Sequence, residues 1–261
     1  MAKTKLRKYF PRATSYDPEW VQQHSMGENV LFNLESLTEK ISLKPGMRVL
    51  DLGCGKAISS VFLATEFGVQ VWAVDEAIPA TENLERIKEG QVTDKVFPLQ
   101  ADARALPFAE AYFDAVLVVD SYTYFGTDEK YLPYICKFIK PGGVIAIADV
   151  CFTEEIENLK AVPKFLQKDY QQYWYYIHSV AWWRKLWEKT GLVEITCAEE
   201  LPGKELVRQE YIRYFEGKRQ KDAFAKAVAK DKNGLISFFR LIGRRTSQPS
   251  YLQSYKEEKA S

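Results

Sequence analysis

Glycine and acidic residues follow three apolar runs of the sequence at spacings that suit the binding of a nucleoside. Gly53 and Gly55 come directly after residues 49–52, where the missing side chains let the backbone turn tightly and approach a ligand closely. Asp75 follows the next apolar run, where a carboxylate can accept hydrogen bonds from both ribose hydroxyls. Asp102 follows a third run and is placed for an adenine amino group.

The glycine turn argues against a dinucleotide. The fingerprint G-x-G-x-x-G requires a third glycine at position 58, but this chain has Ile58. The side chain of Ile58 therefore hinders the close approach of a pyrophosphate. This makes a nicotinamide-dependent oxidoreductase the less favoured function. The pattern predicts recognition of adenosine without pyrophosphate.

These residues need a parallel sheet to bring them together. Strand-like runs and helical patterns alternate from residue 20 to 150, which is typical of a parallel sheet covered on both faces. We expect strands over 48–51, 69–75, 95–100, 113–119, 144–150, 192–198 and 235–244. We expect helices over 20–41, 57–67, 79–89, 128–139, 179–190 and 205–230. Thr127 and Ser179 are candidate helix caps, residues 141–143 a turn, and Gly191 a left-handed helix stop.

The expected architecture is a doubly wound, mostly parallel, seven-stranded α/β sheet with a helical, aromatic-rich cap insertion. No Pro/Ser/Gly linker divides the chain, so residues 1–261 are expected to form one domain. Within it we distinguish an N-terminal helical segment (1–44), a cofactor-binding core (45–150), the cap and its following helix (151–190), C-terminal strands and helix (191–245) and a polar tail (246–261).

Five motifs in order, DLGCG, VWAVDEA, QADARALPF, FDAVLVVDSYTYF and KPGGVIAI, make residues 45–150 resemble the class I, Rossmann-like methyltransferases that use S-adenosylmethionine. The later part, including AWWRKLWEKTGLVE, is similar to a bacterial subgroup that methylates small molecules. The resemblance implies an S-adenosyl-L-methionine cofactor, and we expect no metal. Ala57 stands where the family usually has another glycine, which we expect to be harmless.

The resemblance also implies roles for individual residues. Asp51 and the backbone of Gly53, Cys54 and Gly55 are expected to face the methionine part of the cofactor. Asp75, with Glu76 beside it, is expected at the ribose, and Asp102 and Ala103 beside the adenine. Lys56 either meets the methionine carboxylate or is simply exposed.

Acceptor-side candidates follow the fourth expected strand. Asp120 can orient the cofactor ammonium or an amine substrate, or only bond a nearby amide. Tyr122 and Tyr124, two apart, would share one face of an extended segment and attract a sulfonium or an amine, although packing alone also explains them. His178 is a candidate general base or a helix-start hydrogen-bond partner.

Two further segments that contain aromatic residues each have two possible roles. Trp182, Trp183 and Trp187 fall at helical spacing and are expected in the core. Residues 16–29 form either a lid over the cofactor or an ordinary packing helix.

Composition narrows the class of protein. The net charge is +1, and the basic start is not followed by the apolar run of a signal peptide, so we expect a cytoplasmic protein without a membrane segment. Four scattered cysteines indicate neither a metal site nor a disulfide framework. Basic residues gather in 217–245, which indicates a solvated helix face or, less favoured, a nucleic-acid contact.

We therefore expect an enzyme that methylates a small polar molecule by in-line transfer, with an amine as one candidate acceptor. A homo-oligomer is one candidate assembly. Methylation of RNA or protein is the alternative, although DSYTY differs from the Asn/Asp-Pro-Pro-aromatic tetrapeptide of RNA-base amino methyltransferases. A non-catalytic cofactor-binding module of the same fold is the other alternative.

Overall fold

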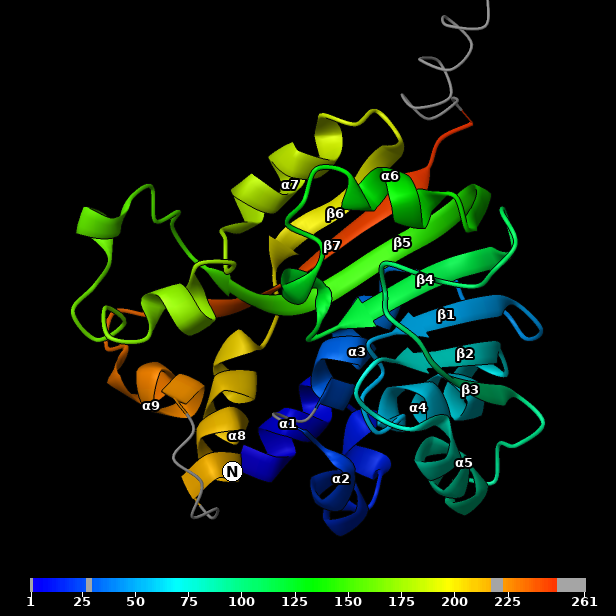
Figure 1. Cartoon of the computed structure of the whole chain (residues 1–261). Coiled ribbons are helices and arrows are strands. Elements are labelled where there is room, and N and C mark those ends of the chain that lie inside the picture. The colour runs from blue at the N-terminus through cyan, green and yellow to red at the C-terminus, as the bar shows by residue number, and fades with distance from the viewer. Residues whose placement is uncertain (1, 27–29, 217–222, 248–261) are drawn as a thin grey trace, which may run out of the picture.

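A seven-stranded sheet lies at the centre of the computed structural model, which describes residues 2–26, 30–216 and 223–247 (Figure 1). Its strands are β1 (Arg48–Leu52), β2 (Gln70–Asp75), β3 (Val96–Gln100), β4 (Phe113–Val119), β5 (Ile139–Phe152), β6 (Val193–Glu200) and β7 (Ile236–Arg245). The order is β3-β2-β1-β4-β5-β7-β6. Strands β1 to β5 are parallel and β7 is antiparallel to both neighbours, so the predicted mostly parallel sheet is confirmed.

Helices cover both faces of the sheet, as its nearly continuous apolar strands require. They are α1 (Ala2–Tyr9), α2 (Pro18–His24), α3 (Val30–Thr38), α4 (Ile58–Phe67), α5 (Ala80–Glu89), α6 (Tyr131–Cys136), α7 (Val180–Glu188), α8 (Lys204–Glu216) and α9 (Ala223–Lys230). Figure 1 shows α6 and α7 on one face and α3, α4 and α5 on the other, which confirms the doubly wound arrangement. In the described part of the chain, no helix is long and apolar enough to span a membrane.

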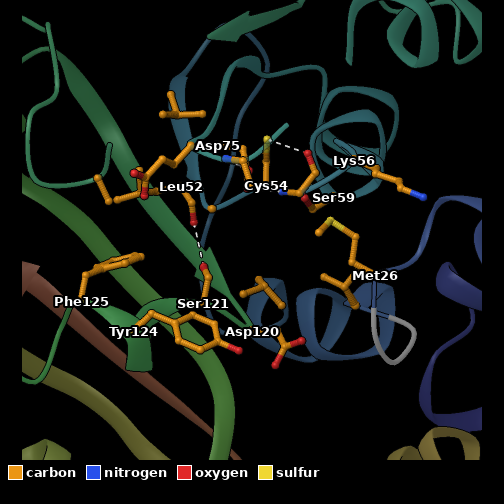
Figure 2. A pocket seen from close by; sticks show the side chains of 18 of the residues that line it. Met26, Leu52, Cys54, Lys56, Ser59, Asp75, Asp120, Ser121, Tyr124 and Phe125 are labelled. Atoms are coloured by element: carbon orange, nitrogen blue, oxygen red, sulfur yellow. Dashed lines mark hydrogen bonds between the residues drawn. The ribbon is translucent and has the colours of Figure 1, made fainter. Parts of the chain in front are cut away.

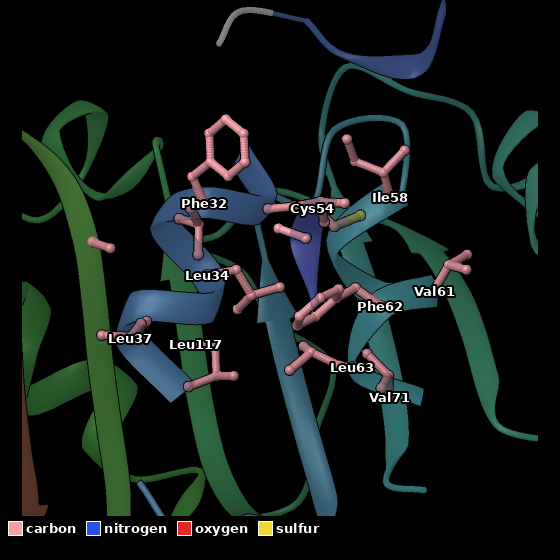
Figure 3. Packing of buried hydrophobic residues seen from close by; sticks show 14 of the residues in the cluster. Phe32, Leu34, Leu37, Cys54, Ile58, Val61, Phe62, Leu63, Val71 and Leu117 are labelled. Atoms are coloured by element: carbon pink, nitrogen blue, oxygen red, sulfur yellow. The ribbon is translucent and has the colours of Figure 1, made fainter. Parts of the chain in front are cut away.

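The packing of α3 and α4 fixes the start of the sheet (Figure 3). Leu34 and Leu37 of α3 and Phe62 of α4 are fully buried against Val71 of β2 and Leu117 of β4. Burying each such side chain contributes roughly 1.5–3 kcal/mol relative to exposure. This packing gives the loop between β1 and α4 a rigid support.

The N-terminal region differs from the prediction of one helix over 20–41. Two helices form instead, because Asp17 caps α2 through the Glu19 N–H while Ser25 is extended and ends it. Helix α3 is buried along almost its whole length, whereas α2 is largely exposed, so the two cannot share one axis and one buried face. Residues 27–29 lie outside the described residues.

The region before β5 also differs from the prediction. Helix α6 is shorter than the expected 128–139, and Thr127 does not cap it, since Lys130 stands at its start without a side-chain cap. Strand β5 begins at Ile139, before the expected turn at 141–143. Those residues form an irregularity in the strand, because Ile139 pairs with Phe113 and the next pair is Val144 with Ala115.

The cap over 153–178 is mostly irregular rather than helical, with short turns at Leu159–Ala161 and Tyr170–Trp174. Its buried Trp174 stacks on Phe224 of α9 with ring centroids 4.8 Å apart, so the cap packs through side chains and needs no regular helix. The Ser179 hydroxyl caps α7, as predicted, and Gly191 is left-handed (φ 64°).

The helix expected over 205–230 is two helices, α8 and α9, and residues 217–222 between them lie outside the described residues. Within the described part of the basic segment, Lys226, Lys230 and Lys232 are exposed, in line with a solvated face. Arg240 is buried instead and donates to Glu199 and to the Ser36 carbonyl. Of the expected tail, residues 248–261 also lie outside the described residues.

Candidate functional site

A cavity of about 430 Å³ opens at the carboxyl ends of the central strands. Strand order reverses between β1 and β4, which is where open parallel sheets bind ligands. The loops after four strands and the end of α2 line it (Figure 2), through residues 24–26, 52–56, 74–77, 101–104, 119–121 and 124–125 among others. The cavity therefore collects most of the residues singled out in the sequence.

The turn after β1 requires its glycines. Gly53 (φ 71°) and Gly55 (φ 53°) are left-handed, and a side chain at Gly53 would collide with the Ser121 hydroxyl. A side chain at Gly55 would lie 3.0 Å from the sulfur of Met26. Ala57, expected to replace a glycine without consequence, is itself left-handed (φ 61°), a conformation that costs a residue with a side chain about 1–2 kcal/mol. The departure from glycine therefore has a cost.

Asp75 anchors this turn. Its Oδ2 accepts from the Gly55 N–H at 2.8 Å, and its Oδ1 accepts from the N–H groups of Ala77 and Ile78 at 2.9 and 3.0 Å. A carboxylate has about four acceptor sites, so capacity remains for a ligand hydroxyl. Asp75 thus lines the cavity as predicted and also holds the loop.

Asn83 of α5 is a residue that the sequence reasoning missed. Its Nδ2 donates to the Gly55 carbonyl at 2.9 Å, and its Oδ1 accepts from Arg86 at 2.9 Å. Both sides of Gly55 are therefore fixed by side chains from other elements. The available signal was an asparagine in mid-helix, one turn before the buried Ile87 and hence on an inward face.

Asp51 does not line the cavity, contrary to the prediction that it faces the ligand. It is 1% exposed and lies beneath the turn, where it accepts hydrogen bonds from Ser59 and Ser60 at 2.6 and 2.5 Å. Burial raises the pKa of Asp51 to about 6, although both serine hydroxyls oppose the rise. Asp51 therefore acts on a ligand only indirectly, because it holds the N-terminus of α4 and because its charge lies close to the cavity.

Cys54 and Glu76 both line the cavity. The Cys54 thiol is buried, and burial raises its pKa well above the ordinary value, so it is an apolar contact rather than a nucleophile. The Glu76 carbonyl accepts from Gln100. Lys56 also lines the cavity and is half-buried, and its Nζ donates to the Gln23 carbonyl at 3.3 Å.

Asp102 and Ala103 lie in the loop after β3 and line the cavity, as predicted. The Asp102 Oδ1 accepts from the Arg104 N–H at 2.8 Å, while Arg104 Nε lies 3.6 Å away. The Ala103 carbonyl accepts from the Tyr131 hydroxyl at 3.1 Å, which ties this loop to α6.

The end of β4 is held in an unusual conformation. Asp120 lines the cavity with φ 55°, and its N–H donates to the Ala148 carbonyl at 2.9 Å. The next residue, Ser121, donates from its hydroxyl to the Leu52 carbonyl at 3.1 Å. These bonds link the ends of β1, β4 and β5, so the backbone strain at Asp120 is retained at the cavity wall.

Tyr122 and Tyr124 do not share a face, contrary to the prediction. Residues Tyr122–Tyr124 form a 3-10 turn rather than an extended segment, which sends the two rings in different directions. Tyr122 is fully buried between Trp183 and Trp187 in the core, whereas Tyr124 is 64% exposed and lines the cavity. Only Tyr124 is placed to meet a ligand.

His178 also lies away from the cavity lining, so the structure does not bring it together with the other candidate catalytic residues. Its Nδ1 is 2.7 Å from Glu155 Oε1, and its ring stacks on Trp182 with centroids 3.6 Å apart. Glu155 further accepts from the N–H and hydroxyl of Ser179 at 2.8 Å. His178 therefore fastens the cap to the start of α7. Trp183 and Trp187 are core residues, as predicted, and Trp182 is half-buried.

The end of α2 lies over the glycine turn. His24 and Met26 line the cavity, and His24 Nε2 lies 3.3 Å from Glu89 of α5. Burial lowers the pKa of His24, although the nearby Glu89 opposes this shift. The end of this segment lines the cavity, while Trp20 and Val21 pack on the core, so the lid and the packing helix both stay open for 16–29.

Comparison with known proteins agrees with this geometry. Residues 49–143 match the family described as "Methyltransferase domain". The O-methyltransferase resE of Aspergillus sclerotiorum is 30% identical over 131 residues, which span 48% of each chain. The chain spans about half the length of the curated relatives it matches, which come from fungi as well as from Streptomyces. Membership of the bacterial subgroup therefore stays a prediction.

Solved structures share the whole fold. A geranyl diphosphate C-methyltransferase from Streptomyces coelicolor, in complex with Mg2+, geranyl diphosphate and S-adenosyl-L-homocysteine, has a TM-score of 0.67 at 15% identity and covers 94% of this chain and 98% of its own. The [4+2]-cyclase SpnF has a TM-score of 0.68 at 13% identity and covers 95% and 98%. The Rossmann-like methyltransferase fold is thus confirmed.

Proposed function

We propose that this chain, which carries a methyltransferase domain over residues 49–143, transfers a methyl group from S-adenosylmethionine to a small polar molecule. The observation that carries the proposal is the Gly55 turn fixed to Asp75 at the sheet's switch point, with Asp102 in the same cavity. The two carboxylates suit a ribose and an adenine.

The residues present fit the cofactor. The left-handed turn at Gly53 and Gly55 leaves backbone facing the cavity where side chains would collide with their neighbours, so a ligand can approach the chain closely. Asp75 retains acceptor capacity for a ribose hydroxyl, and Asp102, which lines the same cavity, would accept from the adenine amino group. The ionised form of Asp51 beneath the turn would favour a cationic group above it.

When bound, S-adenosylmethionine supplies a methyl group on a positively charged sulfur. The chain then has to orient an acceptor lone pair in line with that bond and exclude water, and orientation of this kind contributes roughly 7–11 kcal/mol. Asp120 and Tyr124 are the cavity residues that we assign to the acceptor side, and no base among them is required for an acceptor that already has a lone pair.

A small acceptor is favoured by the size of the cavity. At about 430 Å³ it lies toward the lower end of the range for ligand pockets, and cofactor and acceptor must share it. The end of α2 and the loop at 124–125 limit access further. An amine is one candidate acceptor. RNA or protein methylation is the alternative, but the described lysines of the basic segment are solvated and none lines the cavity.

Calorimetry with S-adenosylhomocysteine, with NAD as the control ligand, tests the cofactor. We expect binding of the first and none of the second. Incubation with S-adenosylmethionine labelled in the methyl group and a metabolite extract, followed by mass spectrometry, then identifies the acceptor. Cofactor binding without any labelled product would favour a module that has kept the fold without methyl transfer. The cyclase SpnF has a similar fold and is named for a different reaction.

A further inference from the structure

The wall of the cavity opposite Asp75 is aromatic and acidic. Figure 2 shows Asp120, Tyr124 and Phe125 on one side of the cavity and Asp75, Cys54 and Lys56 on the other. The acidic residue of this wall is Asp120. Its carboxylate would attract a positively charged acceptor but would give no such attraction to a neutral or negatively charged one. The composition of this wall therefore carries information about the charge of the acceptor.

Tyr124 is supported by further aromatic rings of the cap. Its ring lies 5.4 Å from that of Tyr176, and Tyr176 meets Tyr175 edge-on at 5.0 Å. Tyr175 is 58% exposed, so this row of rings leads from solvent to the cavity. The Tyr124 face is therefore held in place although it is exposed, which suits contact with a ligand rather than packing.

Two acidic groups lie near this aromatic row. Asp120 lies in the same wall, and the buried carboxylate of Asp149 at the end of β5 acts electrostatically on Tyr176 and accepts from the Thr123 N–H at 3.2 Å. The negative potential of carboxylates in a partly desolvated wall favours a cation, and it adds to the attraction of the ring face.

The basic side chains of the described lining lie elsewhere. Lys56 contacts the Gln23 carbonyl beside α2, and Arg104 lies next to Asp102 in the loop after β3. Neither belongs to the aromatic wall, so in the described part of the chain that wall offers no partner for a phosphate or carboxylate. An acceptor with an anionic group near its reacting atom would meet repulsion from Asp120.

We propose that the acceptor is a small aliphatic amine without a phosphate, bound as a cation against Tyr124 with Asp120 beside it. This inference rests on the proposed function. For transfer, the ammonium releases a proton to solvent, and the nitrogen lone pair forms the new N–C bond. The electrons of the breaking C–S bond stay on sulfur, which becomes a neutral thioether, and the product is the N-methylated ammonium.

The experiment uses the full-length protein saturated with S-adenosylhomocysteine and three probes, namely choline, its neutral carbon isostere 3,3-dimethylbutan-1-ol, and phosphocholine. Binding is measured by NMR line broadening. We expect choline to bind more tightly than the isostere and than phosphocholine. Loss of a cation–π contact costs about 0.5–2 kcal/mol, so Tyr124→Leu should weaken choline binding roughly 2- to 30-fold.

Three further variants complete the test. Tyr124→Phe keeps the ring and should keep choline binding, whereas Asp120→Asn should weaken it without affecting the isostere. Tyr173→Leu changes an exposed cap tyrosine that does not line the cavity and should have no effect. A thermal unfolding transition like that of the wild type shows that each variant is folded.

The outcomes separate this inference from the proposed function. If S-adenosylhomocysteine binds but choline binds no better than its isostere, or Tyr124→Leu leaves choline binding unchanged, the amine inference is overturned and the methyltransferase proposal stands. If S-adenosylhomocysteine itself does not bind, both are overturned.

Discussion

The side-chain amide of Asn83 and the carbonyl of Gly55 lie 2.9 Å apart and form a hydrogen bond between α5 and the turn after β1. The N–H of the same glycine donates to Asp75 at 2.8 Å. Asn83 is almost fully buried and does not line the cavity. It is therefore a positioning residue, which acts on a ligand only through the shape of the turn.

Asn83→Leu should weaken binding of S-adenosylhomocysteine about tenfold. The substitution keeps the volume but leaves the part-buried Gly55 carbonyl with only the weak Cys54 thiol donor at 3.7 Å, and losing the amide hydrogen bond costs about 1–3 kcal/mol. Calorimetry measures the affinity, and thermal unfolding measures how much of the cost falls on stability instead. Glu85→Gln on the exposed side of α5 is the matched control and should change neither quantity.

Asp75→Ala should weaken the same ligand by at least tenfold, because it removes the acceptor for ribose and also releases the Gly55, Ala77 and Ile78 N–H groups. Asp94→Ala, an exposed aspartate paired with Lys95, is the control and should bind normally. Unchanged affinity in Asp75→Ala would remove this carboxylate from the ribose role.

Strand positions could be predicted from the sequence because buried parallel strands are short apolar runs bounded by turns. Helix boundaries were predicted less well. The break at Ser25 depends on which face of each segment is buried, and the irregular cap is held by contacts such as Trp174 with Phe224 between distant segments. A single sequence does not display such contacts.

Site residues could be predicted where they lie at or just after the carboxyl end of a strand, as Gly53, Asp75 and Asp102 do. It could not be predicted where backbone geometry decides the direction of a side chain. The 3-10 turn sends Tyr122 into the core and Tyr124 into the cavity, and Asp51 turns toward Ser59 and Ser60 instead of the ligand. Asn83 was missed because its partner is a backbone carbonyl of another element.

Tyr122→Phe should change the free energy of unfolding by less than about 1 kcal/mol and leave methyl transfer unchanged. The Tyr122 hydroxyl approaches Trp187 but has no hydrogen bond of ordinary geometry among the described residues. Removing it therefore exposes no new unsatisfied group. Tyr122→Ala is the contrasting variant, with an expected loss of about 3–5 kcal/mol from the cavity it creates. A tenfold fall in turnover of a stable Tyr122→Phe protein would restore the catalytic role.

Asp51 should make the folded protein less stable as pH rises from about 4 to about 6. Burial raises its pKa in the folded protein to about 6 from an ordinary value of 3.8, so in this window the folded state binds more protons than the unfolded state. The stabilisation from Asp51 is complete below the pKa of the unfolded state. Between that pKa and the pKa of the folded state, the free energy of unfolding falls by about 1.4 kcal/mol for each pH unit.

Urea unfolding of the wild type and Asp51→Asn at pH 4.5, 5.5, 6.5 and 7.5 isolates this contribution, because all other titrating groups are shared. The asparagine cannot ionise and keeps one oxygen to accept from Ser59 or Ser60. The wild-type free energy of unfolding should therefore fall relative to the variant between pH 4.5 and 6.5 and then run parallel to it. Curves that stay parallel over the whole range would show that the Asp51 pKa is not raised by folding.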